Sequence, residues 1–222
     1  MDDWLQFLGW WISEGWIENK HIVGISQAKD SPYIETIQSL LDRLPFGFSR
    51  GENGGMYRWR CTDKALAIWL KQNCGAGAEN KRLPELPFAL CASQARTLLD
   101  ALWDGDGTWN EDAPHYRGCF TTISKQLADD VQALILNVGE WGAIGVNREA
   151  GAHPDFPNAP TCWVVYRSEQ KIRSLARTRN IETVPYKGTV WCFEAPPNKM
   201  FITRRNGCPL IAGNTSMERP IN

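Results

Sequence analysis

Two carboxylates, Glu14 and Asp106, are the residues of this sequence whose type and spacing best suit chemistry. Glu14 lies near the end of the mostly apolar segment 5–16, LQFLGWWISEGW, and Asp106 lies near the end of segment 97–109, TLLDALWDGDGTW. We expect both segments to form helices that a glycine closes at the C-terminal cap. Because the C-terminal end of a helix is already negative, each site also predicts a neighbouring cation.

The two segments begin two copies of one repeat. Glu14 and Asp106 are 106 − 14 = 92 residues apart, and similar elements are predicted after each. We interpret each half as helix, strand, helix, two strands and a last short helix; an αββαββ order would need the early strand to be split. Two copies predict a pseudo-twofold axis. The predicted strands are 21–26, 46–51, 56–61, 118–123, 143–148 and 162–167, and the predicted later helices are 33–44, 63–73, 125–137 and 169–177.

Packing of the two helices at this axis would bring Glu14 and Asp106 together, and Gly9 and Ala101 would permit the close backbone approach. At about 4 Å and an effective dielectric near 20, two carboxylates repel by roughly 4 kcal/mol, which a divalent cation reverses. Oxygen-only ligands favour Mg²⁺, with water and phosphate oxygens as the remaining ligands. Hydrolysis of a phosphodiester is the chemistry that this arrangement supports.

The same segments resemble a known family. FLGWWISEG (7–15) and LDALWDGDG (99–107) are similar to the two dodecapeptide motifs of LAGLIDADG homing endonucleases, the first being the more divergent, and the resemblance covers roughly residues 4–177. It implies a Mg²⁺-dependent, site-specific endonuclease for double-stranded DNA, in which Glu14 and Asp106 bind metal and each direct the cut on one strand. The block ENKRLPELP resembles the part of the family that carries a catalytic lysine, which implies that Lys81 stabilises charge or positions water.

We therefore expect an α+β fold with two pseudo-symmetric LAGLIDADG repeats, about 4–74 and 95–177, joined by the linker 75–94, whose antiparallel sheets face DNA. Side chains alternate along a strand, so Arg58 and Arg60 share a face. Arginine suits guanine edges and phosphates. For any single arginine, a solvated surface charge is an equally good interpretation. The candidate DNA contacts are Arg50, Arg58, Arg60, Arg117, Arg148 and Arg167.

Residues 178–214 differ in pattern from the repeats. They predict a strand at 188–194, a turn at 196–198 and a partner strand at 199–204, followed by a strong turn signal at Asn206-Gly207. This small β-rich segment resembles the last two sequence blocks of an intein. The resemblance implies splicing roles for Cys192, Asn214 and Thr215, with residues 215–222 as the start of the C-extein.

The intein resemblance has departures that affect its chemistry. Gly213 replaces the frequent penultimate His, and Cys192 stands where the family more often has Asp. The sequence leaves no room for an N-terminal splicing block before segment 5–16. We therefore expect no cis-splicing by this polypeptide alone, and an N-terminal intein fragment is a candidate partner.

The amino-acid composition limits which partners, metal sites and cellular compartments are expected. The net charge of −1 gives no global basic field, so basic residues that bind nucleic acid must be gathered on one face. The seven cysteines form no C-x-x-C pair, which excludes a typical zinc site and argues against a disulfide framework. With neither a signal peptide nor a membrane span, we expect a cytoplasmic monomer. A decayed LAGLIDADG module that grips DNA or RNA without cutting is the alternative interpretation.

Overall fold

The computed structural model describes residues 1–85, 89–110, 112, 116–153, 155–169, 183–189, 195 and 199–213. The chain forms two compact units, residues 1–170 and 171–222. The boundary predicted at residue 177 lies outside the described residues, as do Cys192, Asn214 and Thr215.

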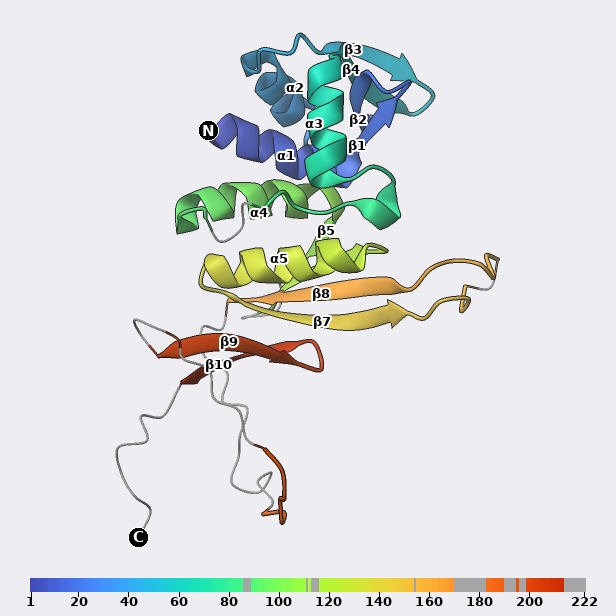
Figure 1. The fold of residues 1–222 in the computed structure, drawn as a ribbon. Coiled ribbons are helices and arrows are strands. Elements are labelled where there is room, and N and C mark those ends of the chain that lie inside the picture. Colours follow the sequence, from blue (N-terminus) through green and yellow to red (C-terminus); the bar gives the residue numbers. More distant parts are fainter. Residues whose placement is uncertain are drawn as a thin grey trace. The chain divides into compact units, whose positions relative to one another are not determined.

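The first half of residues 1–170 contains three helices and one antiparallel sheet of four strands (Figure 1). The strand order is β1-β2-β4-β3. The early strand is split, because β1 begins directly after the first helix, so the simpler order predicted above was wrong. The elements are α1 (Asp2–Glu14), β1 (Gly15–Glu18), β2 (Ile22–Ala28), α2 (Ile34–Arg43), β3 (Ser49–Asn53), β4 (Met56–Thr62) and α3 (Lys64–Cys74).

The second half repeats this plan. Its strand order, β5-β6-β8-β7, corresponds strand for strand to that of the first sheet. The α+β fold with antiparallel sheets is therefore as predicted, while the predicted helix 169–177 falls almost wholly outside the described residues. The elements are η1 (Ala78–Asn80) in the linker, then α4 (Ala92–Asp106), β5 (Gly107–Trp109), β6 (Tyr116–Thr122), α5 (Lys125–Asn137), β7 (Trp141–Arg148) and β8 (Cys162–Ser168).

Helices α1 and α4 pack side by side at the junction of the two repeats (Figure 1). A Cβ atom on Gly9 would lie 2.6 Å from the Ala101 Cβ, which is far inside van der Waals contact. A second contact between the two helices joins Gly105 to Ser13, whose Oγ donates a hydrogen bond to the Leu102 carbonyl (3.1 Å). Small residues therefore allow the close approach that the sequence predicted for Gly9 and Ala101.

The glycines predicted to close the two helices, Gly15 and Gly107, are their C-cap residues, and their backbone N–H groups donate to the Trp11 and Trp103 carbonyl oxygens. Gly15 and Gly107 are extended, with φ of −91° and −85°, so neither adopts the left-handed conformation of a typical glycine cap. A Cβ on Gly15 would overlap the Trp11 carbonyl, and one on Gly107 would lie 2.5 Å from the Trp103 carbonyl oxygen. Glycine is thus required because the first strand of each repeat passes against the last turn of the helix.

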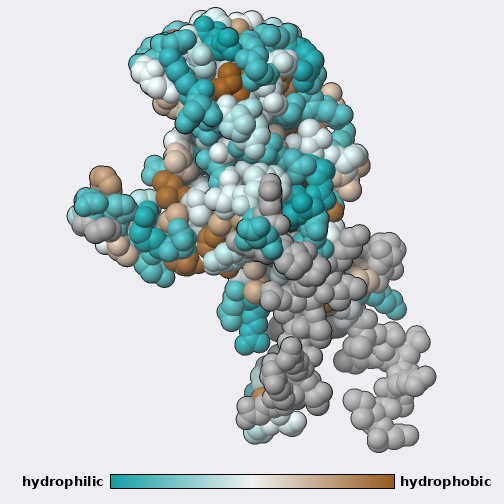
Figure 2. Space-filling model, turned by 180° about the vertical axis from the view of Figure 1, so that it is seen from behind, coloured by the Kyte–Doolittle hydropathy of each residue, from teal (hydrophilic) through white to brown (hydrophobic). Residues whose placement is uncertain are grey.

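The core of the first unit contains large aromatic side chains as well as aliphatic ones. Trp10, Trp11, Trp59 and Trp103 are all fully buried. Figure 2 shows a mainly hydrophilic surface over the first repeat, at the top of the view. No helix in the described part of the chain is long and apolar enough to cross a membrane.

In the second unit, β9 (Met200–Arg205) and β10 (Cys208–Gly213) form an antiparallel hairpin. Asn206 and Gly207 both have positive φ, 51° and 74°, as a two-residue turn of this kind requires. The predicted Asn-Gly turn is confirmed. The partner of β9 is β10, whereas the strand predicted at 188–194 lies mostly outside the described residues.

Candidate active site and nucleic-acid interface

Glu14 and Asp106 occupy the last positions of α1 and α4, where the packed helices end. Burial and the negative charge of Asp106 raise the pKa of Glu14 to about 7. Asp106 keeps an exposed edge, but the partial loss of water around its carboxyl raises its pKa to about 6 against the opposing effect of Lys81. The two carboxyl groups predicted from the repeat are therefore electrostatically coupled, and both resist ionisation.

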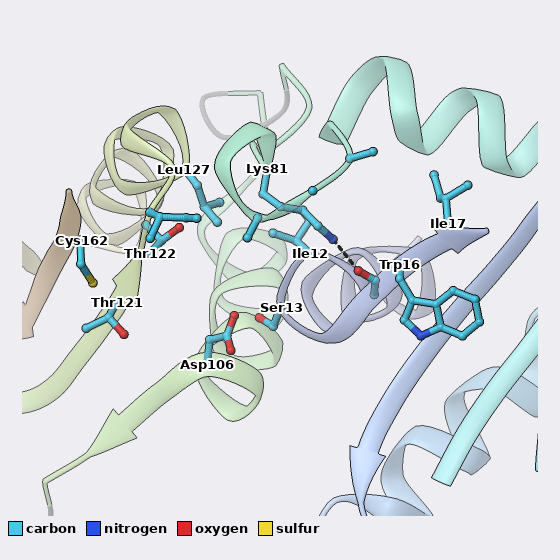
Figure 3. Close-up of a pocket in the computed structure, with 15 residues that line it drawn as sticks. Ile12, Ser13, Trp16, Ile17, Lys81, Asp106, Thr121, Thr122, Leu127 and Cys162 are labelled. Carbon is cyan, nitrogen blue, oxygen red and sulfur yellow. Dashed lines mark hydrogen bonds between the residues drawn. The ribbon is translucent and has the colours of Figure 1, made fainter. Parts of the chain in front are cut away.

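Lys81 supplies the cation that the end of α1 requires. Its buried ammonium donates hydrogen bonds to the carbonyl oxygens of Trp11 (2.8 Å) and Gly15 (3.0 Å), the second of which is drawn in Figure 3. The same nitrogen lies 3.7 Å from the centre of the Trp11 ring. Burial lowers the pKa of Lys81 to about 8, although nearby negative groups that include both Asp106 and Glu14 oppose this. The structure thus brings Lys81 into the site.

Two residues at this site were not predicted. The side chain of Gln27 of β2 lies near Glu14 and acts to lower the pKa of Glu14. Ser124 caps α5 by accepting from the Leu127 amide (3.1 Å), and its hydroxyl donates to the Lys81 carbonyl (2.6 Å). A serine before a helix is a recognisable cap signal, but its contact with Lys81 spans 43 residues and has no local signature.

A cavity of about 630 Å³ lies where the two repeats meet. Figure 3 shows Lys81 and Asp106 reaching it from the linker and from the end of α4, with Ser13, Thr121 and Cys162 on its walls. Within the described residues there is no group of three or more His, Cys, Asp or Glu side chains suited to a metal. A carboxylate pair with an open side still fits Mg²⁺, which usually takes one or two protein carboxylates and completes its shell with water and phosphate.

The end of α4 differs from that of α1. There the Trp103 ring is contacted by the guanidinium of Arg167, 5.2 Å from the ring centre. Arg167 is only 1% exposed and donates to Glu140 (2.6 Å) and Asp100 (3.1 Å), while Glu140 also accepts from Arg96 (2.5 Å). These ion pairs hold the Arg167 side chain in the core, an arrangement that does not favour its predicted contact with DNA.

The first sheet separates its arginines between two faces. Trp59 and Cys61 of β4 are buried against the helices, so Arg58 and Arg60 lie on the outer face, as predicted. Arg50 is paired with Trp59 across β3 and β4 and therefore shares the inner face. It contacts Glu35 of α2 (3.6 Å) and does not lie beside Arg58 and Arg60.

The two remaining arginine candidates lie at the ends of the second sheet. Arg117 is exposed and pairs with Glu169. Arg148 ends β7, and its buried Nε has no hydrogen-bond partner among the described residues. Nothing observed at Arg117 or Arg148 tests a contact with DNA, so their roles in DNA binding remain predictions.

Comparison with known proteins identifies the class of fold. Residues 93–173, which contain the second repeat, match the family described as LAGLIDADG-like domain. The chain is also similar to solved structures of I-DmoI, a homing endonuclease. The structure of I-DmoI in complex with DNA and Mn matches with a TM-score of 0.50 and 14% identity over 75% of this chain and 89% of that chain. The complex with DNA and Ca matches with a TM-score of 0.51 and 13% identity over 75% and 83%. At these identities the likeness establishes the fold.

Curated relatives share parts of the sequence. The chain is 26% identical to the DNA-directed RNA polymerase subunit beta C-terminal section of Stigeoclonium helveticum, over 99% of this chain and 24% of that protein. It is 31% identical to the ATP-dependent Clp protease proteolytic subunit of Chlamydomonas moewusii, over 65% and 15%. It is 26% identical to a DNA polymerase of Thermococcus hydrothermalis, over 76% and 10%. The chain therefore spans about a quarter or less of these relatives.

Proposed function

We propose that this chain is a site-specific endonuclease for double-stranded DNA that acts with Mg²⁺. The observation that carries the proposal is the pairing of Glu14 and Asp106 at the ends of two packed helices, with the pKa of both raised and Lys81 beside them. Two carboxylates held together against their mutual repulsion are suited to share a divalent cation. The likeness in fold to I-DmoI, whose structures contain DNA with Mn or Ca, supports DNA as the partner.

Each residue of the site has a distinct part in this proposal. Glu14 and Asp106 would hold the metal, which supplies Lewis-acid activation of water and charge neutralisation at the phosphate. Gln27, which lies near Glu14, would favour the ionised form of the Glu14 carboxyl that binds the metal. Lys81 holds the carbonyl groups at the end of α1 and provides a fixed positive charge beside the cavity, where a phosphate would gain negative charge during cleavage.

The test is cleavage of a plasmid that carries the host gene without the segment that encodes this chain. We expect linear DNA in Mg²⁺, and a large loss of cleavage in Asp106→Asn and in the double variant with Glu14→Gln. Asp42→Asn is the matched control, since Asp42 is an exposed carboxylate on α2. Equal cleavage by the wild type and the double variant would refute the proposal, and a duplex bound but never cut would favour the decayed binding module.

We further propose that residues 178–214 are the C-terminal splicing segment of an intein. Support comes from the relatives, since an RNA polymerase subunit, a protease subunit and a DNA polymerase have unrelated activities yet share parts of this sequence. An inserted element would leave this pattern in its hosts. Mass spectrometry tests it: adding an N-terminal intein fragment should accelerate release of residues 215–222, and Asn214→Ala should prevent it. Rapid complete release without the fragment would contradict the dependence on a partner.

A further inference from the structure

The outer face of the first sheet carries an aromatic residue, Trp16, two positions after Glu14. Trp16 of β1 is paired with Gly24 of β2, which is paired in turn with Arg60 of β4. The Trp16 ring packs against Gly24: a Cβ at position 24 would lie no more than 2.7 Å from three atoms of the indole. Glycine at position 24 thus lets the ring rest on the backbone of the sheet.

The Trp16 ring is fixed in place and supports an arginine. Its Nε1 donates a hydrogen bond to the Ser26 hydroxyl (2.8 Å), and the Arg60 guanidinium lies over the ring, 5.3 Å from its centre. Arg60 is exposed and makes no ion pair within the described part of the chain, in contrast to Arg50 with Glu35. Stacking on a pinned indole limits the freedom of the guanidinium while its N–H groups remain available.

The second sheet has different chemistry at the corresponding positions. Thr108 of β5 is paired with Cys119 of β6, which is paired with Tyr166 of β8. The Thr108 hydroxyl and the Cys119 sulfur are 3.2 Å apart, and Tyr166 is 44% exposed. A Trp-Gly-Arg row beside Glu14 therefore corresponds to a neutral Thr-Cys-Tyr row beside Asp106.

We propose that Arg60, held on Trp16, is a specificity-determining residue that recognises a guanine in the half of the DNA target bound by the first sheet. The planar guanidinium fork matches the O6 and N7 acceptors of guanine in the major groove, and a fixed fork loses less freedom on binding. The second sheet has no arginine at the equivalent position and reads its half by other contacts, so the target is asymmetric. This inference rests on the proposed DNA-cutting function.

The experiment selects bound duplexes from a pool with a randomised segment, using the full chain in Ca²⁺, and sequences them. The wild type should enrich an asymmetric site with one position in which guanine is preferred. Arg60→Gln, which removes the charged fork, should reduce that preference by at least about five-fold, the lower limit for a bidentate arginine contact, and leave other positions unchanged. Trp16→Leu should reduce the guanine preference to the same extent. Trp16→Phe, which keeps an aromatic ring, should reduce it less.

Arg43→Gln is the matched control, because Arg43 is the last residue of α2 and pairs with Asp3 of α1. An enriched site that keeps its guanine in Arg60→Gln would overturn the inference and leave the endonuclease proposal standing. A uniform loss of binding across all sequences would also overturn it, since that result identifies Arg60 as a phosphate contact. A wild-type chain that enriches no sequence would overturn both proposals.

Discussion

Replacement of Gly9 by alanine tests whether the contact between α1 and α4 sets the geometry of the site. The added methyl group would lie 2.6 Å from the Ala101 Cβ, 2.9 Å from the Leu102 amide nitrogen and 3.0 Å from the Leu98 carbonyl oxygen. Ordinary contacts between carbon atoms are about 3.5–4.0 Å, so the helices must separate by roughly 1 Å. Two of the three contacts are backbone atoms, which cannot rotate away.

Two opposing effects decide the stability of Gly9→Ala. Alanine gains about 1 kcal/mol over glycine inside a helix, whereas overpacking of a core costs about 1–3 kcal/mol. We expect the steric cost to win, with a net loss of up to about 2 kcal/mol and a fall in Tm of up to about 8 °C for a protein of this size. Separation of the helices also moves Glu14 away from Asp106, and a displacement of about 1 Å can reduce a reaction rate by about 100-fold.

Thermal unfolding and plasmid cleavage measure the two effects together. Gly51→Ala is the control, because a Cβ at Gly51 has no neighbour within 4 Å. Exchange of the methyl group, Gly9→Ala with Ala101→Gly, removes the 2.6 Å contact but keeps those with backbone, so it should restore only part of the loss. A Gly9→Ala variant as stable and as active as the wild type would show that the helices have room and would refute the reasoning.

Three further predictions concern charges around the site. The fold raises the Glu14 pKa from 4.5 to about 7, so the stability contributed by the protonated Glu14 carboxyl is full below pH 4.5 and is lost as pH rises through 7. Without metal, Glu14→Gln should therefore be more stable than the wild type at pH 8, by at most about 3 kcal/mol, but not at pH 4. Urea unfolding at the two pH values measures this difference. Ser124→Ala should cost about 1 kcal/mol and reduce cleavage, and Ser124→Thr should restore both; unchanged cleavage in the alanine variant would contradict the role in positioning Lys81. Arg167→Met should destabilise by about 3 kcal/mol because Glu140 loses a buried partner, while DNA affinity of the folded fraction stays constant; a loss of affinity alone would contradict burial of Arg167.

The sequence predicted the parts of the fold that depend on long, repeated patterns. The two apolar segments were identified as helices because their apolar residues and terminal carboxylates recur after 92 residues. The short strands β1 and β5 escaped prediction, since 4 and 3 residues that follow a helix without a break carry no measurable alternation. The role of Gly15 was also hidden, because its constraint is the Trp11 carbonyl and not its own φ angle.

The face of a strand on which an arginine lies could not be predicted from its own strand alone. Arg58 and Arg60 were identified as neighbours by alternation, which is a local property. Arg50 shares a face with Trp59 only through the register of β3 against β4. Arg167 lies in the core because Glu140 and Asp100, distant in sequence, neutralise it there. Burial of a charge depends on partners that no local pattern specifies.

Lys81 joins the two repeats and makes them chemically unequal. Its ammonium binds the end of α1 in the first repeat, and its carbonyl is held by Ser124 at the start of α5 in the second. Among the described residues, the cation near the end of α4 is Arg167, which Glu140 and Asp100 retain in the core. The charged side chains that line the cavity in the described part of the chain are Lys81 of the linker and Asp106 of α4. A pseudo-symmetric scaffold with a single such lysine offers different surroundings to the two strands of a bound duplex, in keeping with the unequal outer faces of its two sheets.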